Sequence, residues 1–189
     1  KSILAIEDRN GSILYSSDTD RRGSDVLDPR VAYQITSILA DVSVRPNAFW
    51  QSQLSVPGIE TAAKTGTSAK CLERAPPVSE TGGVGPCLLR RADNTWTLGY
   101  TPSIVTGIWA GNADGSPLGR KADGLSTASR AWHDFMVAAA RLQPGPERFE
   151  VPPGLERVQV SLLSGTLPSP CTPEHLRGTD IFLEERLPQ

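Results

Sequence analysis

The alternation of apolar and polar positions predicts short strands along much of the chain. Residues 3–6 and 13–15 are β-rich, and the stretch DRNG between them favours a hairpin turn because Asn-Gly accepts positive φ at both central positions. A further strand is predicted over residues 59–68. Two more, over 95–100 and 104–110, are joined by the short connection TPS, which suits antiparallel neighbours.

Two stretches have helical periodicity instead. The first helix is predicted over residues 28–42, with Asp28 as the N-cap and Pro29 in the first helical position. Its apolar residues recur at helical spacing and predict one buried stripe, formed by Val31, Ile35, Ile38, Leu39 and Val42. The second helix, over 125–142, also has one apolar face. Together these elements predict an α+β fold in which helices cover an antiparallel sheet.

The chain divides at a Pro/Gly-rich stretch. Residues 1–143 are predicted to form the domain and residues 144–189 a linker with a short C-terminal extension. The stretch QPGPERFEVPPG has the composition of a linker. After it only RVQVSLL reads as a strand, and the end is Pro-rich and predicted to be irregular.

Composition excludes several classes of function. The chain has 189 residues and 38% hydrophobic content, enough for one domain with a core. Its net charge of -2 leaves no basic patch for nucleic acid or for a membrane surface, and no apolar run has the length of a membrane helix. The two histidines and three cysteines match no zinc pattern, so neither a metal nor a cofactor is expected.

Cys71 and Cys87 flank a Pro/Gly-rich loop predicted over residues 72–86. A disulfide between them would suit an oxidising compartment, and closing a loop of this size contributes about 3 kcal/mol. The alternative is two free thiols in a flexible loop. Both interpretations stay open because sequence does not fix cysteine connectivity.

The stretch Lys-Thr-Gly-Thr at 64–67 lies late on a predicted strand, and WTLGYTPSIVTGIWAGNADG follows at 96–115, ahead of a helix that reads AWHDFM. As a set, these motifs resemble the transpeptidase domain of class A penicillin-binding proteins. The resemblance covers residues 1 to about 142, and the cysteine-containing tail weakly. It implies the fold shared by penicillin-binding proteins and serine β-lactamases, in which an activated serine attacks a D-Ala-D-Ala stem peptide or a β-lactam.

The resemblance also implies roles for the tetrapeptide. Lys64 would offer a positive charge to the substrate carboxylate, and Gly66 would let the substrate backbone approach. Thr65 and Thr67 would add hydroxyl donors, and the Thr67 backbone N–H would be an oxyanion-hole donor. Lys64 and Thr67 are thus predicted to be catalytic, and all four to bind substrate. Because a pleat places successive residues on opposite faces, they can share one ligand only if the strand borders a cleft.

Two motifs of this family are absent from the sequence: Ser-x-x-Lys, with the nucleophile, and Ser-x-Asn. None of the four lysines has a serine three residues earlier, and none of the four asparagines has one two residues earlier. In the family both motifs precede the hairpin at residues 3–15. The chain, which shows no signal peptide, is therefore expected to be the C-terminal half of a transpeptidase domain and inactive alone.

The expected parent is a bifunctional glycosyltransferase and D,D-transpeptidase that cross-links peptidoglycan outside the cytoplasm, anchored in the membrane by a segment not in this chain. The expected partners of the chain are the stem peptide or a β-lactam, and the serine-bearing N-terminal half; no nucleic acid and no membrane contact are expected. Two alternatives are a non-catalytic cell-wall binding or interaction module that has lost the serine, and a serine β-lactamase fragment. The GYTP strand and the tail disfavour the β-lactamase.

Four residues outside the tetrapeptide receive simpler interpretations. Lys70, just past the predicted strand, is interpreted as a solvated loop lysine. Trp50 is placed in a loop, where it flanks a cleft or packs. Trp96 and Trp109 lie on predicted strands and are interpreted as core or cleft wall.

Overall fold

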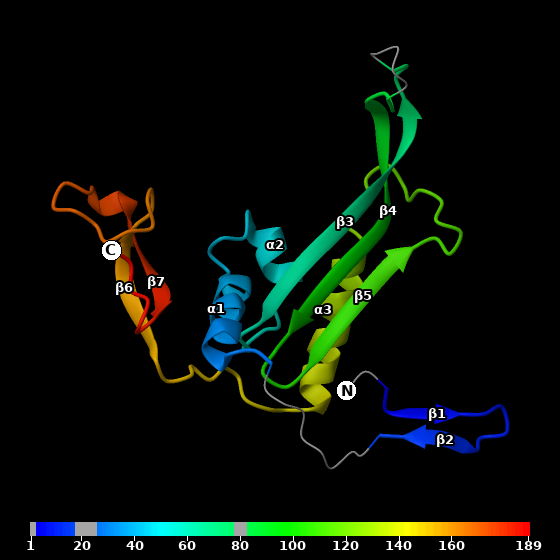
Figure 1. Cartoon of the computed structure of the whole chain (residues 1–189), viewed down its shortest axis with the longest axis horizontal. Coiled ribbons are helices and arrows are strands. Elements are labelled where there is room, and N and C mark those ends of the chain that lie inside the picture. Colours follow the sequence, from blue (N-terminus) through cyan, green and yellow to red (C-terminus); the bar gives the residue numbers. More distant parts are fainter. Residues whose placement is uncertain (1–2, 18–25, 78–82) are drawn as a thin grey trace.

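The computed structural model describes residues 3–17, 26–77 and 83–189. A three-stranded antiparallel sheet in the order β3-β4-β5 forms its centre, and α3 crosses one face of that sheet (Figure 1). The bounds are β3 Ala62–Arg74, β4 Cys87–Tyr100, β5 Val105–Gly111 and α3 Ala128–Leu142. Antiparallel strands with few helices confirm the expected α+β class. No helix in the described ranges is both long enough and apolar enough to cross a membrane.

The first hairpin joins β1 (Ala5–Glu7) to β2 (Ile13–Ser16), as the sequence pattern predicts. Its turn differs from the expected one, in which both Asn10 and Gly11 would have a positive φ. Gly11 has a φ of 82°, but Asn10 does not, since every residue with a positive φ in the described ranges is a glycine. The Asp8 carboxylate accepts hydrogen bonds from the backbone N–H groups of Asn10 and Ser12 at 2.8 and 2.9 Å. These bonds organise a longer turn in which only the glycine needs the left-handed region.

Helix α1 (Pro29–Ala40) begins where the sequence predicts, since the Asp28 side chain accepts from the Arg30 N–H. The prediction that the apolar residues of this helix form one buried stripe is wrong, because Ile35 and Ile38 are 51% and 62% exposed. The buried residue of α1 is Thr36, whose hydroxyl bonds the Ala32 carbonyl and the Tyr100 hydroxyl. Val31 and Leu39 are half-buried, and the rest of the apolar side of α1 has little cover among the described residues.

A second short helix, α2 (Ala48–Gln53), lies where the sequence pattern suggests a loop. Asn47 caps it by accepting from the N–H groups of Phe49 and Trp50. This places Trp50 on a helix, partly buried against the core. The asparagine cap is a signal that the prediction overlooked.

The core lies between α3 and the sheet. Trp132 and Met136 are fully buried, and the Trp132 indole N–H donates to the Thr106 carbonyl at 3.1 Å. Gly99 makes room for this indole, because a Cβ there would lie 2.3 Å from Trp132 Cζ2. The rest of the buried cluster comprises Leu54, Val56, Ala63 and Leu125.

The opposite face of the sheet is uncovered by the described residues. Trp96 and Trp109, paired directly across β4 and β5, are 45% and 44% exposed, so their interpretation as core is wrong. Leu98 and Val105 are exposed on the same strands. A monomer rarely leaves such contiguous apolar surface open to water.

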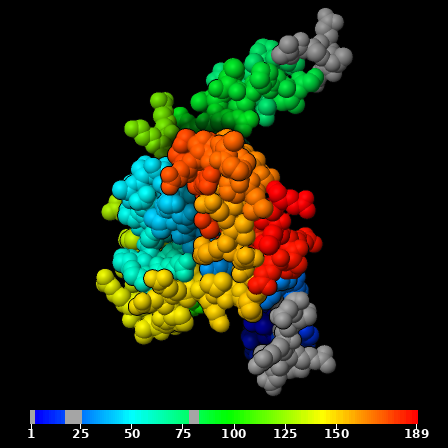
Figure 2. All heavy atoms as spheres, turned by 90° about the vertical axis from the view of Figure 1, so that its left-hand side faces the viewer, coloured from blue at the N-terminus to red at the C-terminus, as the bar shows by residue number. Residues whose placement is uncertain are grey.

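The C-terminal tail is more regular than predicted. β6 (Leu155–Ser161) pairs with β7 (Arg177–Leu183), and a single 3-10 turn, Glu174–Leu176, precedes β7. The tail lies against α1 (Figures 1 and 2), where the Gln34 amide donates to the Ile181 carbonyl at 2.8 Å. Arg30 forms ion pairs with Asp28 and Glu185 at 2.8 and 2.9 Å. Division of the chain at residue 143 stays a prediction.

Candidate functional site

Strand β3 carries the tetrapeptide 64–67 at the edge of the central sheet. Among the described residues β3 pairs only with β4, with Lys64 opposite Leu98 and Thr67 opposite Thr95. Both residues lie in a stretch of regular pairing that ends at Ser68, where the register shifts. The tetrapeptide is therefore held by a regular ladder on one side, and its other side has no partner strand in the part of the chain that the structure describes.

The pleat divides the tetrapeptide between the two faces, as the sequence predicts. The Thr67 hydroxyl lies on the α3 side and accepts from the Gly124 N–H at 2.9 Å. Thr65 lies on the same side, and Lys64 and Gly66 lie on the open face. The two hydroxyls thus point away from the face that carries the ammonium.

The free edge of β3 presents backbone groups of the two threonines. The Thr65 carbonyl accepts a 2.7 Å hydrogen bond from Lys64 Nζ. In an antiparallel ladder the N–H and C=O of one residue point to the same side, and the side alternates along the strand. The N–H of Thr67, two residues on, therefore faces the free edge, where no described strand pairs with it.

A cavity of about 290 Å³ borders this edge. Ala63, Lys64 and Thr65 line it together, so successive residues of β3 border one space. The opposite wall comes from α1, α2 and the turn between them, including Ile38, Leu39, Val44, Pro46, Trp50 and Leu54. Lys64 is exposed and lines this cavity.

Arg45 is the second cation of the cavity wall, but its guanidinium is used internally. It donates to the Ser55 hydroxyl at 2.7 Å and to the Leu39 and Thr61 carbonyls at 3.2 and 3.1 Å. Burial lowers its pKa from the usual value. Arg45 thus ties α1 to the start of β3, and Lys64 is the cation at the cavity whose position suits an external anion.

Gly124 supports the tetrapeptide from behind, a role that the sequence pattern did not indicate. It accepts from the Thr97 hydroxyl at 3.1 Å and donates to Thr67. A Cβ at Gly124 would lie 2.8 Å from the Gly66 carbonyl oxygen. A glycine ahead of a helix is the only sequence signal for this contact.

Gly66 differs from Gly124 in its steric requirement. A Cβ at Gly66 would make one contact, with Trp96 Cβ at 3.7 Å, which is ordinary van der Waals distance. The fold of this chain does not need glycine at that position. The empty space lies on the open face, beside Lys64.

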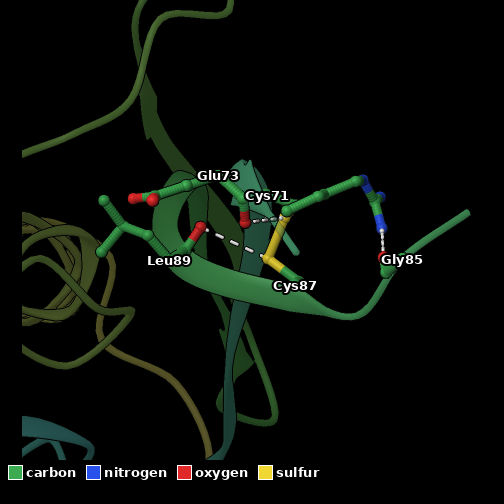
Figure 3. The surroundings of a disulfide bond; sticks show 6 residues. Cys71, Glu73, Gly85, Cys87 and Leu89 are labelled. Atoms are coloured by element: carbon green, nitrogen blue, oxygen red, sulfur yellow. Dashed lines mark hydrogen bonds between the residues drawn. A yellow bond between two sulfur atoms is a disulfide. The ribbon is translucent and has the colours of Figure 1, made fainter. Parts of the chain in front are cut away.

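A disulfide joins Cys71 to Cys87 (Figure 3). The two cysteines lie on strands, because β3 and β4 extend well beyond the predicted limits and shorten the predicted loop. Beyond the disulfide, Arg74 donates to the Gly85 carbonyl at 3.2 Å. A Cβ at Gly85 would lie 1.8 Å from the Ala75 carbonyl oxygen, so the chain segments that follow β3 and precede β4 approach each other closely there.

No cluster of three or more potential metal ligands occurs among the residues that the structure describes. Thiol ligands are further limited because two of the three cysteines form the disulfide.

Comparison with known proteins gives a consistent set of relatives. No family model matches the chain. Penicillin-binding protein 1A of Rickettsia bellii is 29% identical over 205 residues, covering 97% of this chain and 23% of the relative. Penicillin-binding protein 1A of Pseudomonas aeruginosa is 28% identical over 148 residues, covering 78% of this chain and 15% of the relative. This chain therefore spans less than a quarter of the length of these relatives.

A solved structure agrees with the sequence relatives. The crystal structure of penicillin-binding protein 1A from Haemophilus influenzae matches with a TM-score of 0.63 and 20% identity, over 99% of this chain and 29% of that chain. At this identity the match concerns the fold. It confirms the expected penicillin-binding transpeptidase fold, present here in part.

Proposed function

From the premise that the chain is related to the penicillin-binding proteins 1A and corresponds to part of them, we propose that it supplies the carboxylate-binding strand of a D,D-transpeptidase. The substrate is a peptidoglycan stem peptide ending in D-Ala-D-Ala, or a β-lactam that imitates it. The parent protein is a serine-type enzyme that also carries a glycosyltransferase, lies outside the cytoplasm and is membrane-anchored. The disulfide suits that oxidising compartment.

The placement of Lys64 at the free edge of β3, beside the cavity, is the observation that carries this proposal. The ammonium is exposed and near enough to the edge to bond the Thr65 carbonyl. A substrate carboxylate at the edge can displace that carbonyl and form a stronger, charge-assisted hydrogen bond. The Thr67 N–H, which faces the same edge, then serves as an oxyanion donor two residues away.

The serine that attacks the substrate comes, in this proposal, from the N-terminal half of the same protein. The uncovered face of the central sheet supports this partner, because Trp96 and Trp109 are partly exposed on it. The hairpin β1–β2 also lacks cover: its large apolar residues, Ile6, Ile13, Leu14 and Tyr15, are all exposed. A second half that packs against these surfaces would bury them and bring its serine to Lys64.

A fluorescent penicillin tests the proposal. The chain alone should show no covalent labelling, since it has no Ser-x-x-Lys motif. Mixing it with a separately produced upstream half should restore labelling, and a Ser→Ala variant of the upstream nucleophile should abolish it again. Labelling of the purified chain alone, or none with the two halves together, would refute the proposed division of the site.

Substituting Gly66→Ala separates binding from folding. Because the added methyl meets only Trp96 at an ordinary distance, we expect the urea midpoint to change little. The methyl enters the space proposed for the substrate backbone, so acylation by penicillin should fall by roughly tenfold or more. Gly99→Ala, which drives a methyl into Trp132, is the matched control and should lower stability instead. A Gly66→Ala protein with full acylation would contradict the substrate path.

A further inference from the structure

Beyond the tetrapeptide, β3 and β4 continue as a hairpin that projects from the body of the molecule (Figures 1 and 2). Lys70 is therefore a strand residue rather than the loop lysine expected from the sequence, and it lies directly opposite Arg91. Two like charges opposite each other destabilise a strand pair. The disulfide, one residue beyond Lys70, keeps the arms together despite this repulsion.

These two cations have no counter-ion in the part of the chain that the structure describes, where the ion pairs are those of Arg30. Two acidic groups lie near them: Asp93, whose carboxylate accepts from the Ser68 hydroxyl at 2.7 Å, and Asp114, whose pKa is lowered first by hydrogen bonds from Ser116 and least by Lys70. The Asp114 carboxylate accepts from the Ser116 N–H at 2.9 Å. Neither carboxylate forms a described ion pair with Lys70 or Arg91, so both cations can bind an external anion.

The hairpin carries a small excess of positive charge. Over residues 69–93 it has four basic side chains, Lys70, Arg74, Arg90 and Arg91, and three acidic side chains, Glu73, Glu80 and Asp93. Arg90 is exposed on the opposite face of β4 and adds to the charge of the hairpin but not to the Lys70–Arg91 pair. This segment therefore departs from the chain as a whole, which has a net charge of -2.

Lys70 lies on the same side of β3 as Lys64, because the two are separated by an even number of residues. The register shift after Ser68 places its extra residue, Asp93, in β4, so the alternation along β3 is kept. At about 3.3 Å per residue, the six steps from Lys64 to Lys70 span about 20 Å. One extended ligand on this side of β3 can reach both positions.

We propose that Lys70 and Arg91 form a second anion subsite, which binds a carboxylate of the same peptide-bearing polymer whose terminal carboxylate meets Lys64. This rests on the proposed function, because that function makes the polymer the ligand. A polymer with many stem peptides repeats its carboxylates, so a second one is available along the strand. A carboxylate held between the two cations forms charge-assisted hydrogen bonds and offsets their repulsion.

Retention on purified insoluble peptidoglycan tests the subsite in the longest natural polypeptide that contains this chain. Removing both charges with K70Q and R91Q should weaken retention at low salt roughly tenfold, since each exposed charge contact contributes modestly. The control pair R141Q and R148Q removes the same charge from exposed positions elsewhere and should bind as the unmodified protein does. Peptidoglycan with its carboxyl groups converted to amides should bind the unmodified protein at least as weakly as K70Q/R91Q binds the native polymer, because amidation also removes the carboxylate that meets Lys64.

Two results would overturn the subsite: equal retention of K70Q/R91Q and the control pair, or an unchanged difference between them on the amidated polymer. Equal retention is also the result expected if the hairpin binds an acidic protein instead of peptidoglycan. A count of free thiols verifies that the disulfide, and with it the hairpin, is intact in each variant. Penicillin labelling of the unmodified protein tests the proposed function separately, so the two failures are distinguishable.

Discussion

The substitution Lys64→Ala should reduce acylation by penicillin about 10- to 150-fold in the assembled enzyme, because a charged hydrogen bond to the ligand contributes roughly 1.5–3 kcal/mol. Lys64 is exposed, and the one hydrogen bond described for its ammonium goes to the neighbouring Thr65 carbonyl. The free energy of unfolding should therefore change by less than about 0.5 kcal/mol. Stopped-flow or gel-based labelling rates and a urea titration measure the two quantities on the same protein.

Lys121→Ala is the matched control for this prediction. Lys121 is also an exposed lysine, in the loop ahead of α3, and no described ion pair involves it. Its removal should leave labelling within about twofold of the unmodified rate, because surface charges away from a site act weakly. Similar rates for the two variants would show that Lys64 is an ordinary strand lysine.

The substitution Trp132→Ala should have the largest effect on stability, a loss of about 3–5 kcal/mol. The indole is fully buried against Gly99, and its N–H satisfies the Thr106 carbonyl. The substitution both opens a cavity and leaves that carbonyl without its partner. The shift in urea midpoint measures the loss under conditions where the unmodified protein unfolds cooperatively.

Phe135→Ala provides the comparison on the same helix. Phe135 is 51% exposed, so its loss should cost less than about 1 kcal/mol if that surface faces solvent. A loss close to that of Trp132→Ala would mean that Phe135 is buried against a partner absent from the described residues. The comparison therefore also measures how α3 is covered in the assembled protein.

Local patterns predicted the elements whose signals lie within a few residues. Asp28 and Pro29 fixed the start of α1 correctly, because a cap acts on the next turn of its own helix. The prediction of which face α1 buries was wrong, because burial depends on which elements pack against the helix. Thr36 is buried through Tyr100, a residue 64 positions away that no local pattern identifies.

The same distinction applies to the candidate site. The motif at 64–67 and the pleat predicted which residues share a face, and the Thr67–Gly124 bond agrees. The length of β3 was underestimated because Pro and Gly at 76–86 suggested that the loop starts early. The disulfide and the Gly85 contact extend the strand pair to Arg74, so the Lys70–Arg91 pair could only be found in three dimensions.

The disulfide has a practical consequence for the third cysteine. With Cys71 and Cys87 bonded to each other, Cys171 is the one thiol left, and it is exposed. A maleimide dye should therefore attach at this single position without any prior mutagenesis. Placed between β6 and β7, it would report by fluorescence anisotropy on how the C-terminal hairpin moves when an antibiotic or cell-wall polymer is added.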